Sequence, residues 1–273
     1  MTISTITPEL DGLKGRLKST WMAGDYDQFS RYMENNTREF YDHLTVYPGC
    51  EMLDVACGSG GLALLAARDG INVTGVDIAA NSVARATARA RAHGLDARFV
   101  EGDAEALPFA DASFDLITSL IGAMFAPRPD AVAGELLRVC CPGGTIAMAN
   151  WTPQGFVGQM FKAISRFIAP AGMPAPVLWG DEATARERFS SGVADLSLTR
   201  RNFYFDYPFS PAEVVEFFRL YYGPTQRAFS TLGEQDREAL RMELEALWSS
   251  HNLAGGRLTI VPAEYLEVIA IRA

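Results

Sequence analysis

The sequence predicts an α/β fold in which a mostly parallel sheet is flanked by helices on both faces. The leading observation is that short apolar runs alternate with helical stretches between residues 52 and 150. A second observation is the size of the chain, which has 273 residues, 48% of them hydrophobic. That is enough to bury the core of one large domain with helical additions.

The amino-terminal residues 8–45 are expected to form two helices that are broken near Gly24-Asp25. Apolar residues such as Leu17 and Trp21 recur at helical spacing in this part of the chain. Asp25 suits the N-cap of the second helix, because its carboxylate can accept from the free backbone N–H groups of the first turn.

The strands of the sheet are expected next, with helices between them. The predicted strands are 52–56, 72–77, 97–100, 114–119 and 145–150. The predicted helices are one at about 61–68, one that ends at His93-Gly94 and one at 131–139, after which Pro142-Gly143-Gly144 leads into the fifth strand. Strand, helix and strand repeated in this way are typical of a parallel sheet.

After Trp151 the pattern changes to a predominance of helix. Helices are expected at about 155–168, 181–189, 211–222 and 233–248, and strands at about 196–207 and 257–271. The two late strands bring the expected total to seven, and the late helices are predicted to lie between them as additions to the core.

Charge, cysteines and hydropathy exclude several classes of protein. The net charge is −9 with only three lysines, whereas a protein that holds a phosphate backbone usually presents a basic face. The four cysteines and three histidines form no metal-ligand pattern, which favours free thiols in a reducing compartment. No apolar run reaches the ~18 residues of a membrane span, and the first residues lack a secretory signal. We therefore expect a cytoplasmic protein with no nucleic-acid partner, no metal and no membrane span.

Three acidic residues lie where the chain leaves three successive predicted strands. Asp54 belongs to the first strand, Asp77 closes the second and Asp103 follows the third. In a parallel sheet these strand ends share one edge, and ligands bind in the crevice there. Gly58 and Gly60 allow the backbone to turn tightly and to approach a ligand closely. Asp77 stands roughly 20 residues beyond this turn, where an acid can accept hydrogen bonds from a ribose diol.

Several motifs together resemble the class I S-adenosylmethionine methyltransferases. They are the segment 54–60, Asp77, the run 102–109, the strand 113–117 and the segment 135–144. Within that class the chain is similar to the small-molecule branch related to ubiquinone and menaquinone C-methyltransferases. The likeness covers about residues 48–150. It implies a Rossmann-like methyltransferase fold whose last strand is antiparallel, with S-adenosylmethionine as the cofactor.

The resemblance also implies roles for individual residues. Asp77 would hold the ribose hydroxyls, and Asp103 and Ala104 would contact the adenine edge. Ala56 stands where the family more often has glycine, and an alanine is tolerable there if its φ is negative. The full set of implied cofactor residues is Trp21, Asp54, Ala56, Cys57, Gly58, Ser59, Gly60, Asp77, Ile78, Asp103, Ala104 and Ser119.

A division of the chain is implied as well. Residues 1–47 would form an N-terminal helical lid over the cofactor, because 21–26 resembles the closing segment of these enzymes. Residues 48–273 would form the methyltransferase domain, with helical cap insertions at about 152–192 and 211–252. The candidate acceptor residues are Tyr26, Phe125, Trp151, Phe156 and Phe161. As a group they indicate a small apolar or aromatic organic acceptor, and O-, N- and C-acceptors all remain open.

Two other functions are compatible with parts of this pattern. The run 58–63 also satisfies the Gly-x-Gly-x-x-Gly/Ala pattern of NAD(P)-dependent oxidoreductases. Such an enzyme places a pyrophosphate at the turn, whereas Asp54 lies four residues before Gly58 and suits a cationic methionine group better. The second alternative is a protein that binds S-adenosylmethionine without transferring its methyl group.

The sequence assigns no catalytic base. His43 is expected near a helix end, where a cation is favoured by the helix dipole, and His251 is expected in a loop. Displacement on a sulfonium methyl needs mainly alignment of the reactants, because the leaving group is already activated. A base is required only when the acceptor arrives protonated.

Overall fold

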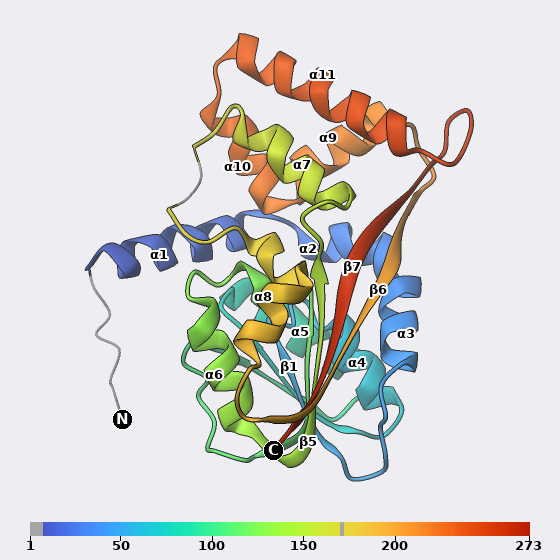
Figure 1. Cartoon of the computed structure of the whole chain (residues 1–273). Coiled ribbons are helices and arrows are strands. Elements are labelled where there is room, and N and C mark those ends of the chain that lie inside the picture. The colour runs from blue at the N-terminus through green and yellow to red at the C-terminus, as the bar shows by residue number, and fades with distance from the viewer. Residues whose placement is uncertain (1–7, 170–171) are drawn as a thin grey trace.

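A seven-stranded sheet with helices on both faces forms the centre of the molecule in the computed structural model, which describes residues 8–169 and 172–273 (Figure 1). The strands are β1 (Glu51–Val55), β2 (Asn72–Asp77), β3 (Ala97–Glu101), β4 (Phe114–Leu120), β5 (Cys140–Trp151), β6 (Val193–Tyr207) and β7 (Thr259–Arg272). They lie in the order β3-β2-β1-β4-β5-β7-β6. The first five pair in parallel, and β7 lies antiparallel between β5 and β6. The predicted fold class is confirmed, including the antiparallel last strand.

The helices cover both faces and one edge of this sheet. They are α1 (Pro8–Ala23), α2 (Tyr26–Phe29), α3 (Glu34–Asp42), α4 (Gly61–Arg68), α5 (Ala80–Ala92), α6 (Pro129–Val139), α7 (Phe156–Ser165), α8 (Glu182–Arg188), α9 (Pro211–Tyr221), α10 (Gly223–Thr231) and α11 (Glu234–His251), with the short 3-10 helices η1 (Ser30–Met33), η2 (Ala123–Phe125) and η3 (Pro176–Gly180). α4 packs against α3 and α5, and α6 packs against β5 and α8. None of the helices in the described parts of the chain is long and apolar enough to cross a membrane.

The predicted boundaries agree with the structure to within a few residues, apart from three differences. The second amino-terminal helix is divided into α2, η1 and α3, although Asp25 does cap it by accepting from the Gln28 N–H. Helix α10 was not predicted, and Pro224 occupies its first turn, where a missing N–H costs nothing. Strand β5 begins at Cys140 rather than after the glycine pair, because Cys140 pairs with Phe114 before a shift of register.

The central strands are buried on both faces, which explains their continuous apolar sequences. Met52 and Leu53 of β1 and Leu116 and Ile117 of β4 are all almost fully buried. Burial of each such side chain contributes ~1.5–3 kcal/mol relative to exposure. This packing fixes the sheet, and with it the carboxyl edge on which the loops after the strands converge.

Helices α7, α9, α10 and α11 lie beyond the carboxyl edge of the sheet, together with α1 (Figure 1). α10 packs against α1 and α9, and α11 packs against α7 and α9. Aromatic side chains fill the space between these helices, for example Trp248, whose ring centroid lies 4.5 Å from that of Phe156 and 5.1 Å from that of Phe218. The segments far apart in sequence therefore form one layer.

Helix α3 is tied to the far edge of the sheet by polar contacts. The Asn36 side chain donates to the Tyr204 carbonyl at 2.9 Å and accepts from the Tyr204 N–H at 2.8 Å, which satisfies part of the free edge of β6. His43 caps the carboxyl end of α3, and its Nδ1 lies 2.8 Å from the Glu267 carboxylate. Its position at a helix end agrees with the sequence analysis, and it lies away from the strand-end acids.

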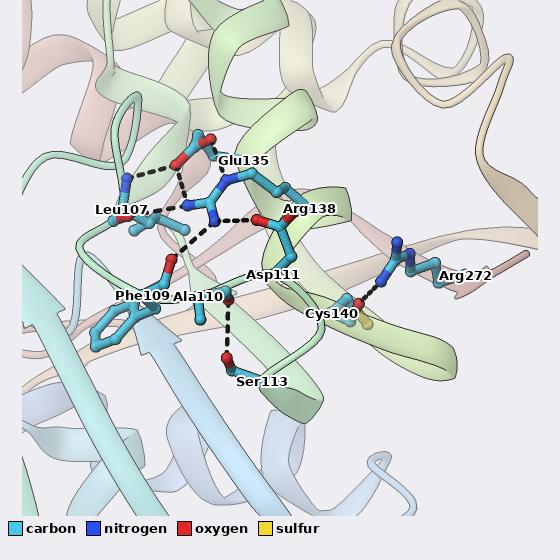
Figure 2. A network of polar contacts seen from close by, with 9 residues as sticks. All are labelled: Leu107, Phe109, Ala110, Asp111, Ser113, Glu135, Arg138, Cys140 and Arg272. Atoms are coloured by element: carbon cyan, nitrogen blue, oxygen red, sulfur yellow. Dashed lines mark hydrogen bonds and ion pairs between the residues drawn. The ribbon is translucent and has the colours of Figure 1, made fainter. Parts of the chain in front are cut away.

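A polar network joins the loop after β3 to helix α6 (Figure 2). Glu135 accepts from the Leu107 N–H at 2.6 Å and from the Arg138 Nε at 2.7 Å. The Arg138 guanidinium also donates to the carbonyls of Leu107 and Phe109 and to the Asp111 carboxylate. The two segments 102–109 and 135–144, which carry part of the resemblance noted in the sequence, are thus joined by one polar network.

Replacement of Arg138 tests the strength of this network. We expect Arg138→Met to lower the free energy of unfolding by about 2–3 kcal/mol, because Glu135 and two carbonyls lose their partner in a half-buried site. Arg241→Met is the matched control, since Arg241 pairs with acids only along the surface of α11, and it should cost less than about 1 kcal/mol. Urea denaturation measures both, and equal losses would contradict the special role of Arg138.

Candidate cofactor and acceptor site

A cavity of about 270 Å³ opens at the carboxyl edge of the sheet. Its floor is made by the loops that follow β1, β2, β3 and β4, and residues of α1, α2 and η1 close it from the amino-terminal side. Asp54, Asp77 and Asp103 all line this one cavity. The parallel register therefore brings together the three acids that the sequence placed at successive strand ends.

Asp54 is the most deeply buried of the three acids, with an exposed fraction of 2%. Its Oδ1 accepts a hydrogen bond from the Thr118 hydroxyl at 3.1 Å, across the parallel pair β1 and β4. Burial raises the pKa of the Asp54 carboxyl to about 7, although the bond from Thr118 opposes this rise. A carboxylate held in such a place gains stability from any cation that enters the cavity.

Asp77 organises the loops around it. Its Oδ2 accepts from the Gly58 N–H and its Oδ1 from the Ala79 N–H, both at 2.8 Å. Burial raises the pKa of Asp77, and these two hydrogen bonds oppose the rise. One carboxylate thus joins the glycine-rich turn to the end of β2 and still faces the cavity.

Asp103 is the acid that contacts the amino-terminal helix. Its Oδ1 accepts from the Glu105 N–H at 2.9 Å, and its Oδ2 lies 2.5 Å from the Lys14 ammonium. Lys14 also lies 2.5 Å from Glu105, whose fully buried carboxylate forms a second ion pair with Arg128. The ion pair with Lys14 therefore holds helix α1 against Asp103, the acid that lines the cavity after β3.

The backbone of the cavity adopts conformations that are rare outside glycine. Gly58 and Gly60 have φ values of +53° and +82°. Ala56 has φ +57° and Ile121 has φ +69°, so the condition of a negative φ at Ala56 is not met. Ala56 lies directly against Gly122, where an added Cβ would come within 2.5 Å of the Ala56 Cβ. Left-handed alanine and isoleucine cost ~1–2 kcal/mol each, and such strain is characteristic of functional sites.

Most of the sequence-predicted site residues line the cavity. Those that do are Trp21, Asp54, Ala56, Cys57, Gly58, Ser59, Asp77, Ile78, Asp103, Ala104, Tyr26, Phe125 and Trp151. Gly60, Ser119, Phe156 and Phe161 do not, and they support the site from behind. For example, the Ser119 hydroxyl donates to the Val55 carbonyl at 2.9 Å and accepts from the Ala123 N–H.

A cluster of aromatic rings forms another part of the lining, the aromatic end of the cavity. Its rings are Trp21, Tyr26, Phe29, Phe125, Trp151, Phe203, Phe205, Phe218 and Tyr222. They come from both the N-terminal segment and the late elements, and they touch one another, as in the stacked pair Phe29 and Tyr222 with centroids 4.9 Å apart. This end suits an apolar or ring-bearing molecule.

Sequence reasoning missed several of these lining residues. Lys14 stands one heptad before Trp21 on the same face of α1, so the helical period could have indicated it. Phe203 and Phe205 alternate on β6 and share a face for the same geometrical reason. Tyr222 carried no such signal, because its position depends on the unpredicted helix α10.

Comparison with known proteins identifies the class. Residues 53–148 match the family model described as a methyltransferase domain. The chain is 38% identical to an uncharacterized protein of Mycobacterium tuberculosis, Rv1405c, over 90% of each chain. It is 43% identical to a Synechocystis 2-methyl-6-phytyl-1,4-hydroquinone methyltransferase over 39% of this chain and 34% of that protein. A geranyl diphosphate methyltransferase solved with S-adenosylmethionine has a similar fold, with a TM-score of 0.54 and 21% identity over 88% of this chain and 85% of the other.

The fold, the strand-end acids and these likenesses define a methyltransferase. The chain belongs to the class I S-adenosylmethionine-dependent methyltransferases. It is accordingly an enzyme that transfers a methyl group from S-adenosylmethionine, which it binds as its cofactor.

The raised pKa of Asp54 makes a prediction about stability without cofactor. Its pKa is about 7 in the fold and ~3.9 in an unfolded chain. Below about pH 4 the carboxyl is protonated in both the folded and the unfolded chain, so it does not change the free energy of unfolding. As the pH rises from about 4 to about 7, the carboxyl ionises in the unfolded chain but resists ionisation in the fold, so the free energy of unfolding falls. Above about pH 7 the effect no longer changes. We expect Asp54→Asn to raise the free energy of unfolding by about 2–4 kcal/mol at pH 8 and by less at pH 5.

Urea denaturation at both pH values measures this effect. The asparagine oxygen can still accept from Thr118, so the hydrogen bond is kept. Asp195→Asn, which changes an exposed acid of β6, is the control and should have a small effect at both pH values. A gain for Asp54→Asn that is as large at pH 5 as at pH 8 would show that burial of charge is not its cause.

Proposed function

We propose that the enzyme methylates a small, uncharged, apolar or aromatic acceptor. The observation that carries the proposal is the division of one cavity into an acidic end at the strand termini and an aromatic end under the N-terminal segment and the late elements. The acidic end suits the polar and cationic cofactor, and the aromatic end suits the acceptor.

The acidic end fits S-adenosylmethionine group by group. We assign Asp54 to the cationic methionine part and Asp77 to the ribose hydroxyls. Asp103 and Ala104 take the adenine edge, with Ile78 against the ring. The fit is supported by Gly58, which lines the cavity and brings no Cβ to the turn that an approaching ligand would meet.

When it is bound, the cofactor supplies a methyl group on a positively charged sulfur. The task of the protein is then to align the acceptor and to exclude water, and alignment alone can be worth about 7–11 kcal/mol of the barrier. Trp21 lines the cavity from α1 and lies edge-on to Phe125 of η2, with centroids 4.8 Å apart. Rings in such contact provide a rigid wall for an acceptor.

The distribution of charge in the cavity lining disfavours the binding of anionic acceptors. Among the described residues that line the cavity, the charged ones are Lys14, Asp54, Asp77 and Asp103. The single ammonium of this set is already shared by Asp103 and Glu105. A phosphate or carboxylate on the acceptor would therefore be buried without a counter-charge, which is strongly unfavourable.

The dinucleotide alternative is disfavoured by the same charges. A pyrophosphate at the turn 58–60 would lie beside the buried Asp54 and the half-buried Asp77, which line the same cavity. Release of S-adenosylhomocysteine in the presence of an acceptor distinguishes an enzyme from a protein that binds S-adenosylmethionine without transferring its methyl group.

Release of S-adenosylhomocysteine tests the proposed function. With S-adenosylmethionine and a panel of neutral phenols, quinols and amines that carry one ring, we expect product release with some members. Phosphorylated or carboxylated counterparts of the same ring should react at least tenfold more slowly, because their charge finds no partner. Faster turnover of the anionic counterparts would contradict the assignment of the aromatic end.

We also propose that residues 1–47 act as a lid and that the segments 152–192 and 211–252 act as a cap over the acceptor. The proposal is supported by α1, which presents Lys14, Leu17 and Trp21 to the cavity at helical spacing. These positions span about 10 Å along the helix axis. The lid thus lies over both ends of the cavity, with Lys14 near the acids and Trp21 near the rings.

Ion pairs hold this lid in place, and one of them offers a sharp test. We expect Lys14→Met to weaken the binding of S-adenosylhomocysteine by about tenfold, because α1 loses its anchor at Asp103. Lys18→Met is the matched control, since Lys18 pairs with Glu101 and does not line the cavity, and it should change affinity by less than about twofold. Titration calorimetry measures both variants, and unchanged affinity in Lys14→Met would separate the docking of α1 from cofactor binding.

A further inference from the structure

We propose that Glu105 is a positioning residue, which holds Trp21 of α1 against Phe125 of η2 and so fixes this part of the aromatic end relative to the cofactor site. The inference rests on the proposed function, because it takes the ring pair Trp21 and Phe125 as part of the wall that faces the acceptor. It goes further by assigning the arrangement of that wall to an acid that does not itself line the cavity.

The first observation is the burial of the Glu105 carboxylate between two cations. The Glu105 side chain is fully buried, and the side chains of its partners Lys14 and Arg128 are only 12% and 25% exposed. A buried carboxylate is costly to the fold unless counter-charges are held close to it. The positions of both cations are therefore tied to the position of Glu105.

Both cations meet the same oxygen atom. The Lys14 Nζ lies 2.5 Å from the Glu105 Oε2, and the Arg128 Nε donates to that oxygen at 2.7 Å. The Arg128 backbone N–H donates to the other oxygen, Oε1, at 2.6 Å. One carboxylate thus joins α1 to the residue that precedes α6. Neither segment can shift without lengthening a bond to a buried charge.

Each of the two joined segments carries a ring of the wall. On α1, Trp21 stands seven residues after Lys14, about 10 Å along the helix axis and close to the same face, and both residues line the cavity. On the other segment, Phe125 stands three residues before Arg128, and it lines the cavity together with the two residues between them. The Trp21 and Phe125 rings meet edge-on with centroids 4.8 Å apart. Their contact therefore depends on the junction at Glu105.

The other attachments of α1 do not replace this junction. Lys18 pairs with Glu101, but these side chains are 36% and 48% exposed, and exposed pairs contribute little. The carboxyl end of α1 is fixed separately, because Gly223 packs so closely that an added Cβ would lie 2.2 Å from the Thr20 carbonyl oxygen. Among the ion pairs of α1, the buried pairs of Lys14 therefore hold its amino-terminal half.

The junction also reaches the cofactor side of the cavity. The Glu105 N–H donates to the Asp103 Oδ1 at 2.9 Å, and Lys14 lies 2.5 Å from the Asp103 Oδ2. Asp103 is the acid that we assign to the adenine edge. Glu105 thus holds the ring wall at a fixed place relative to the cofactor, which is the alignment that methyl transfer requires.

Quenching of tryptophan fluorescence by acrylamide tests this inference without any ligand. The chain has four tryptophans. Trp151, Trp179 and Trp248 are at most 5% exposed, whereas Trp21 is partly exposed. Quenching of the protein therefore reports mainly on Trp21.

Removal of the Glu105 charge is the main variant. We expect Glu105→Gln to raise the quenching constant at least about twofold, because α1 loses a buried anchor and Trp21 separates from Phe125. Glu101→Gln is the matched control, since it removes the exposed partner of Lys18 on the same helix, and it should leave the quenching constant almost unchanged. Equal quenching in Glu105→Gln and in the unaltered protein overturns the inference.

A Trp21→Phe background separates a local effect from general loosening of the fold. Only the three buried tryptophans remain there, so addition of Glu105→Gln should not change the quenching, and an increase in this background overturns the positioning role. If Glu105→Gln does not fold, Lys14→Met takes its place, because Arg128 still neutralises Glu105 in that variant. Lys14→Met should raise the quenching and Lys18→Met should not, and equal quenching in these two variants overturns the inference.

Turnover tests the catalytic consequence. With the neutral ring-bearing acceptor that releases S-adenosylhomocysteine fastest, Glu105→Gln should lower kcat/KM for the acceptor at least about fivefold, and Glu101→Gln by less than about twofold. Equal losses in the two variants overturn the positioning role. If no acceptor of the panel reacts, the proposed function fails, whereas the quenching experiment still decides whether Glu105 positions Trp21.

Discussion

The parallel pairing of β1, β2, β3 and β4 is the constraint on which the rest of this molecule depends. It places the ends of four strands on one edge, so that acids separated by more than twenty residues in sequence meet in one cavity. Desolvation follows directly, because the strands that carry Asp54 and Asp77 are buried. The negative charge of these acids destabilises the fold without a ligand, whereas it stabilises the complex with a cationic ligand. Stability is therefore coupled to cofactor binding.

Backbone strain is concentrated at the same edge. Ala56 follows β1 and Ile121 follows β4, and both are left-handed although neither is glycine. The close contact of Ala56 with Gly122 shows that the two loops are mutually constrained. A strained turn of this kind persists only where the surrounding structure determines it. Here the Ser119 hydroxyl joins the two loops, because it donates to the Val55 carbonyl and accepts from the Ala123 N–H.

The aromatic end of the cavity is made differently from the acidic end. Its rings come from the N-terminal segment, from η2, from β6 and from the α9 to α10 junction, so no single stretch of sequence encodes it. The resulting contrast between a charged floor and an apolar wall is what favours a neutral acceptor.

The sequence by itself determined the fold class, the positions of the first five strands, the three acids and the glycine-rich turn, because these depend on local periodicity and on a short shared motif. It also indicated three acceptor residues that line the cavity, Tyr26, Phe125 and Trp151. Only the tertiary structure decided that Ala56 is left-handed, that Lys14 reaches Asp103 and that Tyr222 joins the aromatic wall. These features arise from contacts between segments far apart in the chain, and such contacts leave no periodic trace in the sequence.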